Sequence, residues 1–265
     1  MTVPSGNPSA ASRASSRALH QTRYDLLVFW RNPQARFFTV LMPLIFLVIF
    51  GAVFGDGTVQ VPGGEVSPKQ YYVPGLGTLG IVSASMVNLT ITVTTQRDTG
   101  VLKRRRATPV PAWVLIAARS LSCVVIALAT VAILVLVGIV VYGVDLPASR
   151  IPALILVVAV GSAAFCCLGF ALAAVIRSAD SAVPVVQAIV LPLYFISGVF
   201  VPADQIPGWL LGVADAFPIR HLAEAMVALF SPAGTLELGH LAIVAVWGVA
   251  GLVIAVRRFR WVKNT

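Results

Sequence analysis

Charged residues are scarce in this chain of 265 residues: Asp, Glu, Lys and Arg together make up 11%, while 58% of the residues are hydrophobic. Soluble globular domains carry roughly 25% charged residues. The composition therefore excludes a soluble protein of this length and predicts a membrane protein. Cysteine and histidine are rare as well, with three of each. The cysteines lie in apolar runs and the histidines are far apart in sequence, so neither a disulfide nor a metal site is predicted.

Catalytic and nucleotide-binding motifs are missing. A P-loop needs Gly-Lys followed by Ser or Thr, and no lysine of this chain follows a glycine. The sequence also has no HExxH motif, no GxSxG motif and no pair of carboxylates inside an apolar run. We therefore predict a protein that is not itself an enzyme, and any energy for transport has to come from another subunit.

Six apolar runs are each long enough to cross the roughly 30 Å hydrocarbon core of a bilayer as a helix, which takes about 20 residues. They cover residues 36–54, 74–95, 112–142, 152–176, 182–200 and 238–256. The third run is over-long, so we expect its first turn at the interface, with Arg119 reaching toward lipid headgroups. The predicted fold is an all-α polytopic membrane protein with six transmembrane helices, and residues 19–258 form its transmembrane domain.

Segments that connect successive runs would lie on alternate sides of the membrane, and the two sides differ in charge. One side collects 16 Lys and Arg with three acids, and the other has three Lys and Arg with seven acids, which leaves net charges of +13 and −4 within the total of +9. Cytoplasmic loops carry the excess of Lys and Arg, so the first side is predicted to be cytoplasmic, with both termini there. Because the basic residues mark topology, no nucleic-acid partner is expected.

Both ends of the chain differ in composition from the spans. Residues 1–18 are mostly Ser, Ala, Pro and Gly, and we predict a disordered cytoplasmic tail there, with a second cytoplasmic tail at residues 259–265. In residues 19–31, Leu19, Leu26, Phe29 and Trp30 alternate with polar residues at loosely helical spacing. This pattern favours an amphipathic helix in the membrane interface, although a plain juxtamembrane linker would also fit.

The link between the fifth and sixth runs is unusually apolar for a loop. It is broken by Pro202, Pro207 and Pro218, and the last two suit the first turn of a short helix. Each resulting helix would have about 11–13 residues, which is too few to span the bilayer. We predict short re-entrant or external helices at the outer leaflet, where protein has to bury their free backbone groups.

A cationic island, residues 96–113, separates the second and third apolar runs. Its charged residues are five cations and one acid: Arg97, Lys103, Arg104, Arg105, Arg106 and Asp98. Gly100 on one side and Pro109 on the other bound a short piece that we expect to form an interfacial helix or turn. This piece would face the cytosol.

Two sets of polar residues lie inside the spans. The second run holds Ser85, Asn88, Thr92 and Thr95 at helical spacing, on one predicted face. The fifth run adds Gln187, Tyr194 and Ser197. Such residues serve either the packing of helices against each other or the lining of a translocation path, and the sequence leaves both interpretations open.

Two segments resemble the permease subunits of type-2 ATP-binding-cassette exporters, and among these the daunorubicin-resistance-like permeases. The first, RDTGVLKRRRATPVPAW at 97–113, is similar to the family's coupling-loop pattern, although the family more often has an acid where Arg97 stands. The second, FISGVFVPADQIPGWLLGVADAFPIRHLAEAM at 195–226, is similar to the family's loop before the last span. The resemblance covers nearly all of residues 19–258.

The resemblance implies a six-span subunit of the cell membrane that pairs with a second, identical or different, permease subunit. It also implies a separate cytoplasmic ATPase, which would bind ATP and magnesium, so that this chain itself holds no cofactor. Residues 19–31 would be the family's interfacial helix. The residues expected at the contact with the ATPase are Arg97, Asp98, Gly100, Lys103, Arg104, Arg105 and Arg106.

Members of this family export drugs, lipids, glycolipids or polysaccharides through a path between two subunits. Sugar paths are often lined by aromatic rings, whereas Tyr71, Tyr72 and Tyr142 are predicted to form an aromatic belt at the outer interface. We therefore favour an apolar or amphipathic substrate. Export of a polysaccharide or glycoconjugate is one alternative, and an ATP-independent channel or assembly protein is another.

Overall fold

The computed structural model describes residues 10–54, 57–61, 63–101 and 112–258, and these residues form an almost entirely helical molecule. Within the described ranges, six helical segments are long and apolar enough to cross a membrane, which confirms an all-α polytopic membrane protein. These segments are Pro33–Val53, Pro68–Asp98, Ala117–Tyr142, Ala148–Val175, Ala179–Ile196 and Leu238–Arg258.

Most of these segments are built from more than one element. The first joins α2 (Pro33–Arg36), the π-helical turn η1 (Phe37–Leu41) and α3 (Met42–Val53), and the second joins α4 (Pro68–Val82), the π-helical turn η2 (Ser83–Val87) and α5 (Asn88–Asp98). The remaining four are α7 (Ala112–Tyr142), η3 (Ala148–Arg150) with α8 (Ile151–Val175), α9 (Ala179–Ile196) and α12 (Leu238–Arg258). Outside the spans lie α1 (Ala10–Arg31), the strands β1 (Val59–Val61) and β2 (Gly64–Val66), η4 (Ala203–Gln205), α10 (Gly208–Ala214) and α11 (Pro218–Phe230).

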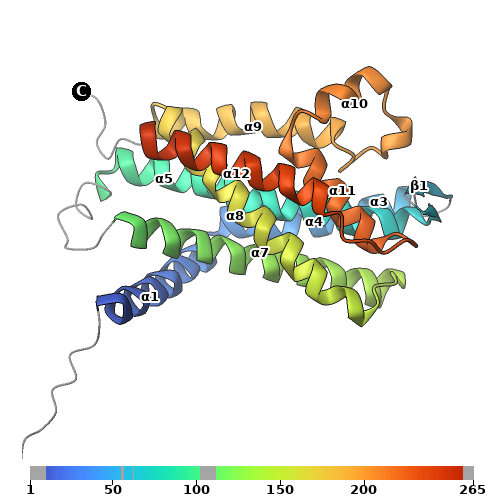
Figure 1. The fold of residues 1–265 in the computed structure, drawn as a ribbon, viewed down its shortest axis with the longest axis horizontal. Coiled ribbons are helices and arrows are strands. Elements are labelled where there is room, and N and C mark those ends of the chain that lie inside the picture. Colours follow the sequence, from blue (N-terminus) through green and yellow to red (C-terminus); the bar gives the residue numbers. More distant parts are fainter. Residues whose placement is uncertain (1–9, 55–56, 62, 102–111, 259–265) are drawn as a thin grey trace, which may run out of the picture.

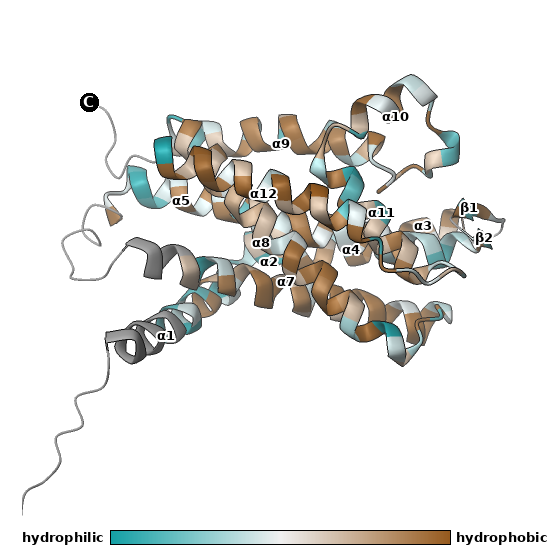
Figure 2. Ribbon diagram, viewed as in Figure 1, coloured by the Kyte–Doolittle hydropathy of each residue, from teal (hydrophilic) through white to brown (hydrophobic). Residues whose placement is uncertain are grey.

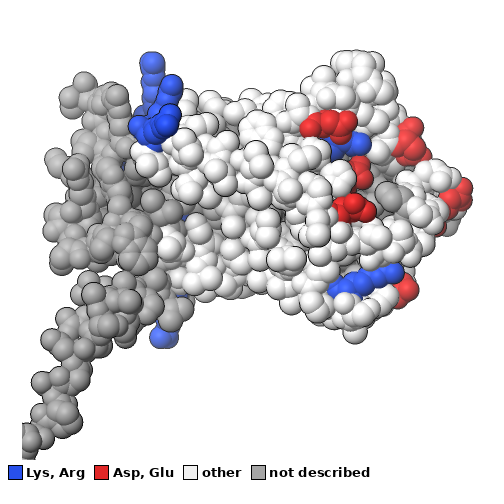
Figure 3. Space-filling model, viewed as in Figure 1, with Lys and Arg blue, Asp and Glu red and all other residues white. Residues whose placement is uncertain are grey.

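The spanning helices run along the long axis of the molecule (Figure 1), and hydrophobic residues dominate their middle parts (Figure 2). The end of α5, the link from α8 to α9 and the end of α12 lie at one end of the molecule. The β1–β2 hairpin, α10 and α11 lie toward the other end. Figure 3 shows Lys and Arg at both ends, whereas the Asp and Glu visible in this view gather at the second end only. This separation is the one that the charge distribution in the sequence predicts for the two sides of a membrane.

The second span forms the centre of the bundle. About 72% of its most apolar window is buried inside the protein, compared with 22% for the first span and 28% for the last. The Ser67 hydroxyl accepts a hydrogen bond from the Gln70 backbone N–H and Pro68 occupies the first turn, so the helix begins earlier than the predicted position 74. Its helical structure continues to Asp98, past the predicted end at position 95.

Helices α8 and α12 pack closely because small residues face each other. A Cβ atom added at Gly248 would lie 2.8 Å from the Ala164 Cα, and one added at Gly251 would lie 2.9 Å from the Leu168 backbone nitrogen. Lipid tails are as apolar as leucine, so helices in a membrane associate through such close backbone packing. The two glycines therefore fix α12 against α8.

The apolar link between the fifth and sixth spans forms two helices of very different burial. Helix α11 has 13 residues, as predicted, and is enclosed by α4, α8, α9 and α12. Helix α10 has 7 residues, fewer than predicted, and Trp209 on it is 73% exposed. Protein therefore surrounds α11, as the backbone of a short helix at membrane depth requires.

Helix α1 begins at Ala10, so helix overlaps the second half of the tail that we predicted to be disordered; residues 1–9 lie outside the described part. Its buried residues Thr22, Asp25 and Phe29 recur at helical spacing, and α1 packs along α7. Tyr24, Leu27 and other residues on its remaining surface are exposed, so one side of α1 packs on α7 and the other side is left uncovered by the described part of the chain.

Candidate coupling site and translocation path

The last turn of α5 carries the first three residues of the predicted ATPase contact. Arg97 and Asp98 end the helix, and Gly100 follows with a φ of 73°, a left-handed conformation that glycine adopts without strain. The Gly100 backbone N–H donates to the Arg97 carbonyl at 3.2 Å, which closes the turn. Within the cationic island, α5 therefore ends on a fixed pair of charges. Lys103, Arg104, Arg105 and Arg106 lie outside the described residues.

Arg97 bonds to the carboxyl end of α8. Its guanidinium donates from Nη1 to the Ala173 carbonyl at 3.0 Å and from Nη2 to the Ile176 carbonyl at 2.7 Å. The last carbonyl groups of a helix have no partner within the helix, and the helix dipole places partial negative charge on them. The Arg97 side chain thus caps α8 from a neighbouring helix, and it is only 9% exposed.

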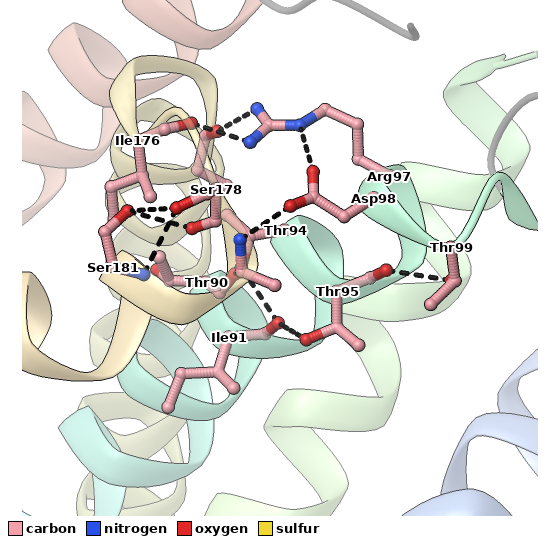
Figure 4. Close-up of polar contacts among 12 residues, drawn as sticks. Thr90, Ile91, Thr94, Thr95, Arg97, Asp98, Thr99, Ile176, Ser178 and Ser181 are labelled. Carbon is pink, nitrogen blue, oxygen red and sulfur yellow. Dashed lines mark hydrogen bonds and ion pairs between the residues drawn. The ribbon is translucent and has the colours of Figure 1, made fainter. Parts of the chain in front are cut away.

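Asp98 bonds to the amino end of α9. Its Oδ2 accepts a hydrogen bond of 2.7 Å from the Ala179 N–H, the first residue of that helix, where the dipole favours an anion. Asp98 Oδ1 lies 3.6 Å from Arg97 Nε, so the two caps form one ion pair. Ser178 completes this end of α9 by accepting from the Ser181 N–H at 3.3 Å, and Figure 4 shows these contacts together.

These contacts make the start of the cationic island and the α8–α9 link one mechanical unit, which we call the double cap (Arg97 and Asp98 with the ends of α8 and α9). Both charged side chains are largely buried against their own chain, at 9% and 15% exposure. Thr90 strengthens the same contact deeper in the membrane, because its hydroxyl lies 3.1 Å from the Gly169 carbonyl of α8. A displacement of the island would therefore move α8 and α9 as well as α5.

The contacts of the Arg119 side chain differ from those predicted. We expected its side chain to reach toward lipid headgroups, but Arg119 Nη1 lies 3.5 Å from Asp25 Oδ1 on α1, and Nη2 donates to Gln96 Oε1 at 2.9 Å. The expectation was wrong because α1 packs on α7 at this depth and supplies a carboxylate that is only 5% exposed. A paired arginine inside the protein avoids the cost of an isolated charge in the membrane.

A small pocket lies beside this ion pair and brings together two of the predicted path residues. Asn88 and Thr92 line it with Asp25, Asn32 and Arg119, and the cavity is about 30 Å³. The Thr92 hydroxyl lies 3.4 Å from the Asn88 Oδ1. The other two residues of the predicted stripe lie elsewhere: Ser85 is fully buried, beside the Cys166 thiol of α8, and Thr95 is exposed. The π-helical turn η2 shifts the register, so the four residues do not form one continuous stripe.

The predicted path residues of the fifth span are spread along α9. Gln187 is half-buried, and the buried Tyr194 hydroxyl donates to the Leu79 carbonyl of α4 at 3.4 Å. Ser197, which ends α9, is fully buried and lines a different pocket, at the end of the molecule that carries the hairpin. The structure therefore does not bring these three residues together with Asn88 and Thr92.

The aromatic belt predicted from three tyrosines is wrong for two of them. Tyr71 and Tyr72 are 5% and 3% exposed, the Tyr71 hydroxyl donates to the Gly198 carbonyl at 2.5 Å, and Tyr72 packs on Phe50. Tyr142 is half-buried. The first two tyrosines start α4, which lies inside the bundle, so their rings face protein rather than lipid headgroups.

Several polar contacts were not found from the sequence. Asp25 in the amphipathic segment was the one available signal, because an acid at a buried helical position needs a partner. The Arg150 guanidinium donates to the Leu229 and Ser231 carbonyls at 2.9 and 2.8 Å. His221 and His240, distant in sequence, bring their Nδ1 atoms to 2.8 Å of each other. In the part of the chain that the structure describes, no three His, Cys, Asp or Glu residues are grouped as metal ligands.

Asn88 lines the pocket beside Arg119, and a substitution there distinguishes a role in the path from a role in packing. If Asn88 lines the path, we expect Asn88→Leu to lower transport by about tenfold, because leucine offers no hydrogen bond to a passing polar group. Transport into vesicles measures this effect, and size-exclusion chromatography in detergent measures assembly. Thr99→Val is the matched control, because Thr99 is exposed, is not a predicted path residue, and its hydroxyl already donates to the Thr95 carbonyl. Loss of assembly in the Asn88 variant, with transport per assembled complex unchanged, would favour the packing role.

Comparison with known proteins agrees with this architecture. The family model for ABC-2 type transporters matches residues 20–231, which is most of the chain. The chain is also 31% identical over 259 residues to the daunorubicin resistance ABC transporter permease protein DrrB1 of Streptomyces coeruleorubidus, a match that covers 93% of this chain and 84% of that protein. The matched region includes the double cap and both pockets. With six spanning helices and this extent of similarity, the chain belongs to the ABC-2 type transporter family as a permease.

Proposed function

We propose that this chain is the membrane subunit of an ATP-driven exporter and that it forms, with a second permease subunit, a path for an apolar or amphipathic substrate. A separate ATPase would bind to the cationic island and supply the energy. ATP and magnesium would bind to that ATPase and not to this chain. Both termini would lie in the cytoplasm, because the side to which the charge count of the sequence assigns them carries the excess of Lys and Arg.

The observation that carries this proposal is the double cap. An island that only fixed the orientation of the protein would need its cations but no bonds to other helices. Arg97 and Asp98 instead bond to the facing ends of α8 and α9 with three hydrogen bonds of 2.7 to 3.0 Å. Such a contact is suited to pass a movement of the island to two further spans. In an ATP-independent channel, no ATPase would move the island, so this connection would have no movement to transmit.

The substrate class rests on the relative rather than on the tyrosines. Tyr71 and Tyr72 are buried, so they no longer argue against a sugar path. The name of the similar protein refers to daunorubicin resistance, which favours a drug-like amphipathic molecule over a polysaccharide. We keep the amphipathic substrate as the proposal for this reason.

Co-purification and reconstitution test the proposal. The gene next to that of this chain is expected to encode an ABC ATPase. The two proteins are expressed together, purified through a tag on the permease, and placed in lipid nanodiscs. We expect the ATPase to co-purify and its ATP hydrolysis to rise at least about threefold when an amphipathic drug is added. A polysaccharide that stimulates hydrolysis in place of the drug would support the alternative cargo. A permease that conducts its substrate in vesicles without ATP or ATPase would contradict the proposal.

A further inference from the structure

A second pocket lies at the end of the molecule that carries the β1–β2 hairpin, where acidic residues gather around the surface (Figure 3). Its volume is about 60 Å³, which is enough for a small charged group but not for a whole drug or lipid. Four polar side chains from four elements or their ends line it: Gln60, Tyr71, Ser197 and Glu224. Val61 and Val227 are part of its apolar wall.

Two polar side chains of this lining already donate a hydrogen bond within the protein. The Tyr71 hydroxyl donates to the Gly198 carbonyl at 2.5 Å, and the Gln60 amide nitrogen donates to Glu65. What these groups still offer is oxygen lone pairs. Ser197 is fully buried, and its hydroxyl has no hydrogen-bond partner among the described residues. A buried hydroxyl without a partner destabilises the protein, and a ligand that bonds to it would remove this cost.

The charge of the pocket is negative. Arg220 is shared between two acids: its Nε lies 2.5 Å from Asp215 Oδ1, and its Nη1 lies 3.2 Å from Glu224 Oε1. Two carboxylates against one guanidinium leave one negative charge in this group. Asp215 makes the shorter contact, so Glu224, which lines the pocket, has the charge less fully compensated. A ligand that fits must therefore bring both a positive charge and N–H donors.

We propose that this pocket binds the ammonium group of a primary alkylamine, with Glu224 as its counter-ion and the Ser197 and Tyr71 oxygens as hydrogen-bond acceptors. An ammonium group has three N–H donors, which match these acceptors, and its alkyl chain would lie along the valine side chains. The role of this site in transport rests on the proposed export function, because the pocket would be a substrate site at the predicted outer end of the path. Binding itself is a property of this chain alone.

Three ligands with the same octyl chain separate charge from hydrogen bonding. Octylammonium has charge and donors, octyltrimethylammonium has charge without donors, and octanol has no charge. They are titrated into the purified permease in nanodiscs, with empty nanodiscs as background, and binding is followed by calorimetry. We expect octylammonium to bind at least about tenfold more tightly than either of the others, because charge-assisted hydrogen bonds are about twice as strong as neutral ones.

Two variants test the residues. Glu224→Gln should weaken octylammonium binding at least about tenfold, and Ser197→Ala should weaken it by about threefold. Ser197→Ala should keep the fold, because the hydroxyl loses no hydrogen bond to any residue that the structure describes. Glu237→Gln is the matched control: Glu237 lies at the same end, bonds to the Thr235 hydroxyl, and does not line the pocket. Equal affinities for the three ligands, or unchanged affinity in both variants, would overturn the assignment.

The same assay identifies the source of the amine. If the ammonium groups of phosphatidylethanolamine occupy the pocket, nanodiscs that contain this lipid will weaken octylammonium binding relative to nanodiscs of phosphatidylcholine. Equal binding in both nanodiscs assigns the site to a free amphipathic amine. These titrations use no ATPase and no ATP, so they stand apart from the export assay. Export that proceeds without amine binding defeats only the ammonium site, whereas amine binding without an ATPase partner defeats only the export function.

Discussion

Replacement of both Arg97 and Asp98 by alanine should leave the ATPase bound but lower transport at least about tenfold. The two side chains cap the facing ends of α8 and α9, and they are largely buried in their own chain. Hydrogen bonds to charged groups contribute about 1.5–3 kcal/mol each, and coupling between distant sites is typically about 1–3 kcal/mol. Loss of the double cap would remove the connection through which the island moves these helices.

Hydrogen exchange and transport measure this prediction together. The Ala179 N–H, which donates to Asp98 in the wild type, should exchange faster in the double variant. Asp98→Asn should retain part of the transport, because the asparagine oxygen still accepts from Ala179. Asp180→Asn is the matched control, since Asp180 lies in the first turn of α9 but is exposed. Wild-type transport combined with fast exchange at Ala179 would show that the double cap only stabilises the fold.

Reversal of Arg104 and Arg105 to glutamate should weaken the association with the ATPase at least about thirtyfold while insertion into the membrane stays unchanged. These residues lie outside the described part, so the prediction rests on the sequence and on the resemblance of the island to a coupling loop. Mispaired charges at a protein interface cost several kcal/mol. Orientation is set by the Lys and Arg excess of all the predicted cytoplasmic segments, so two reversals do not invert it.

The competing interpretation is that these arginines only touch anionic lipid, with about 1 kcal/mol for each charge. Reversal of Arg257 and Arg258 to glutamate provides the control, because both are exposed at the end of α12 and the change in charge is the same. Pull-down of the ATPase over a range of salt concentrations measures the association. If both double variants lose the ATPase equally, or neither does, the island has no specific coupling role.

The class of the protein and the number of its spans could be predicted from the sequence. Whether a segment of about 20 residues prefers lipid to water depends on its own side chains, so it is a local property that the sequence states directly. The amphipathic segment before the first span and the helix at Pro218 were found for the same reason: both have local patterns, a helical period in one case and a proline at a helix start in the other. The start of α1 was not predicted, because this helix begins at Ala10 and not at position 19.

The partners of the polar residues were decided by the tertiary structure alone. Arg119 pairs with Asp25, Tyr71 bonds to Gly198, and Arg97 and Asp98 cap two helices that follow much later in the chain. The register of the second span also changes at the π-helical turn η2, which separates Ser85 from Asn88 and Thr92. Hydrophobic length is summed along one segment, whereas an ion pair or a cap depends on which segments become neighbours. That choice is made by packing, such as the close approach of α12 to α8 at Gly248 and Gly251, and no single stretch of sequence contains it.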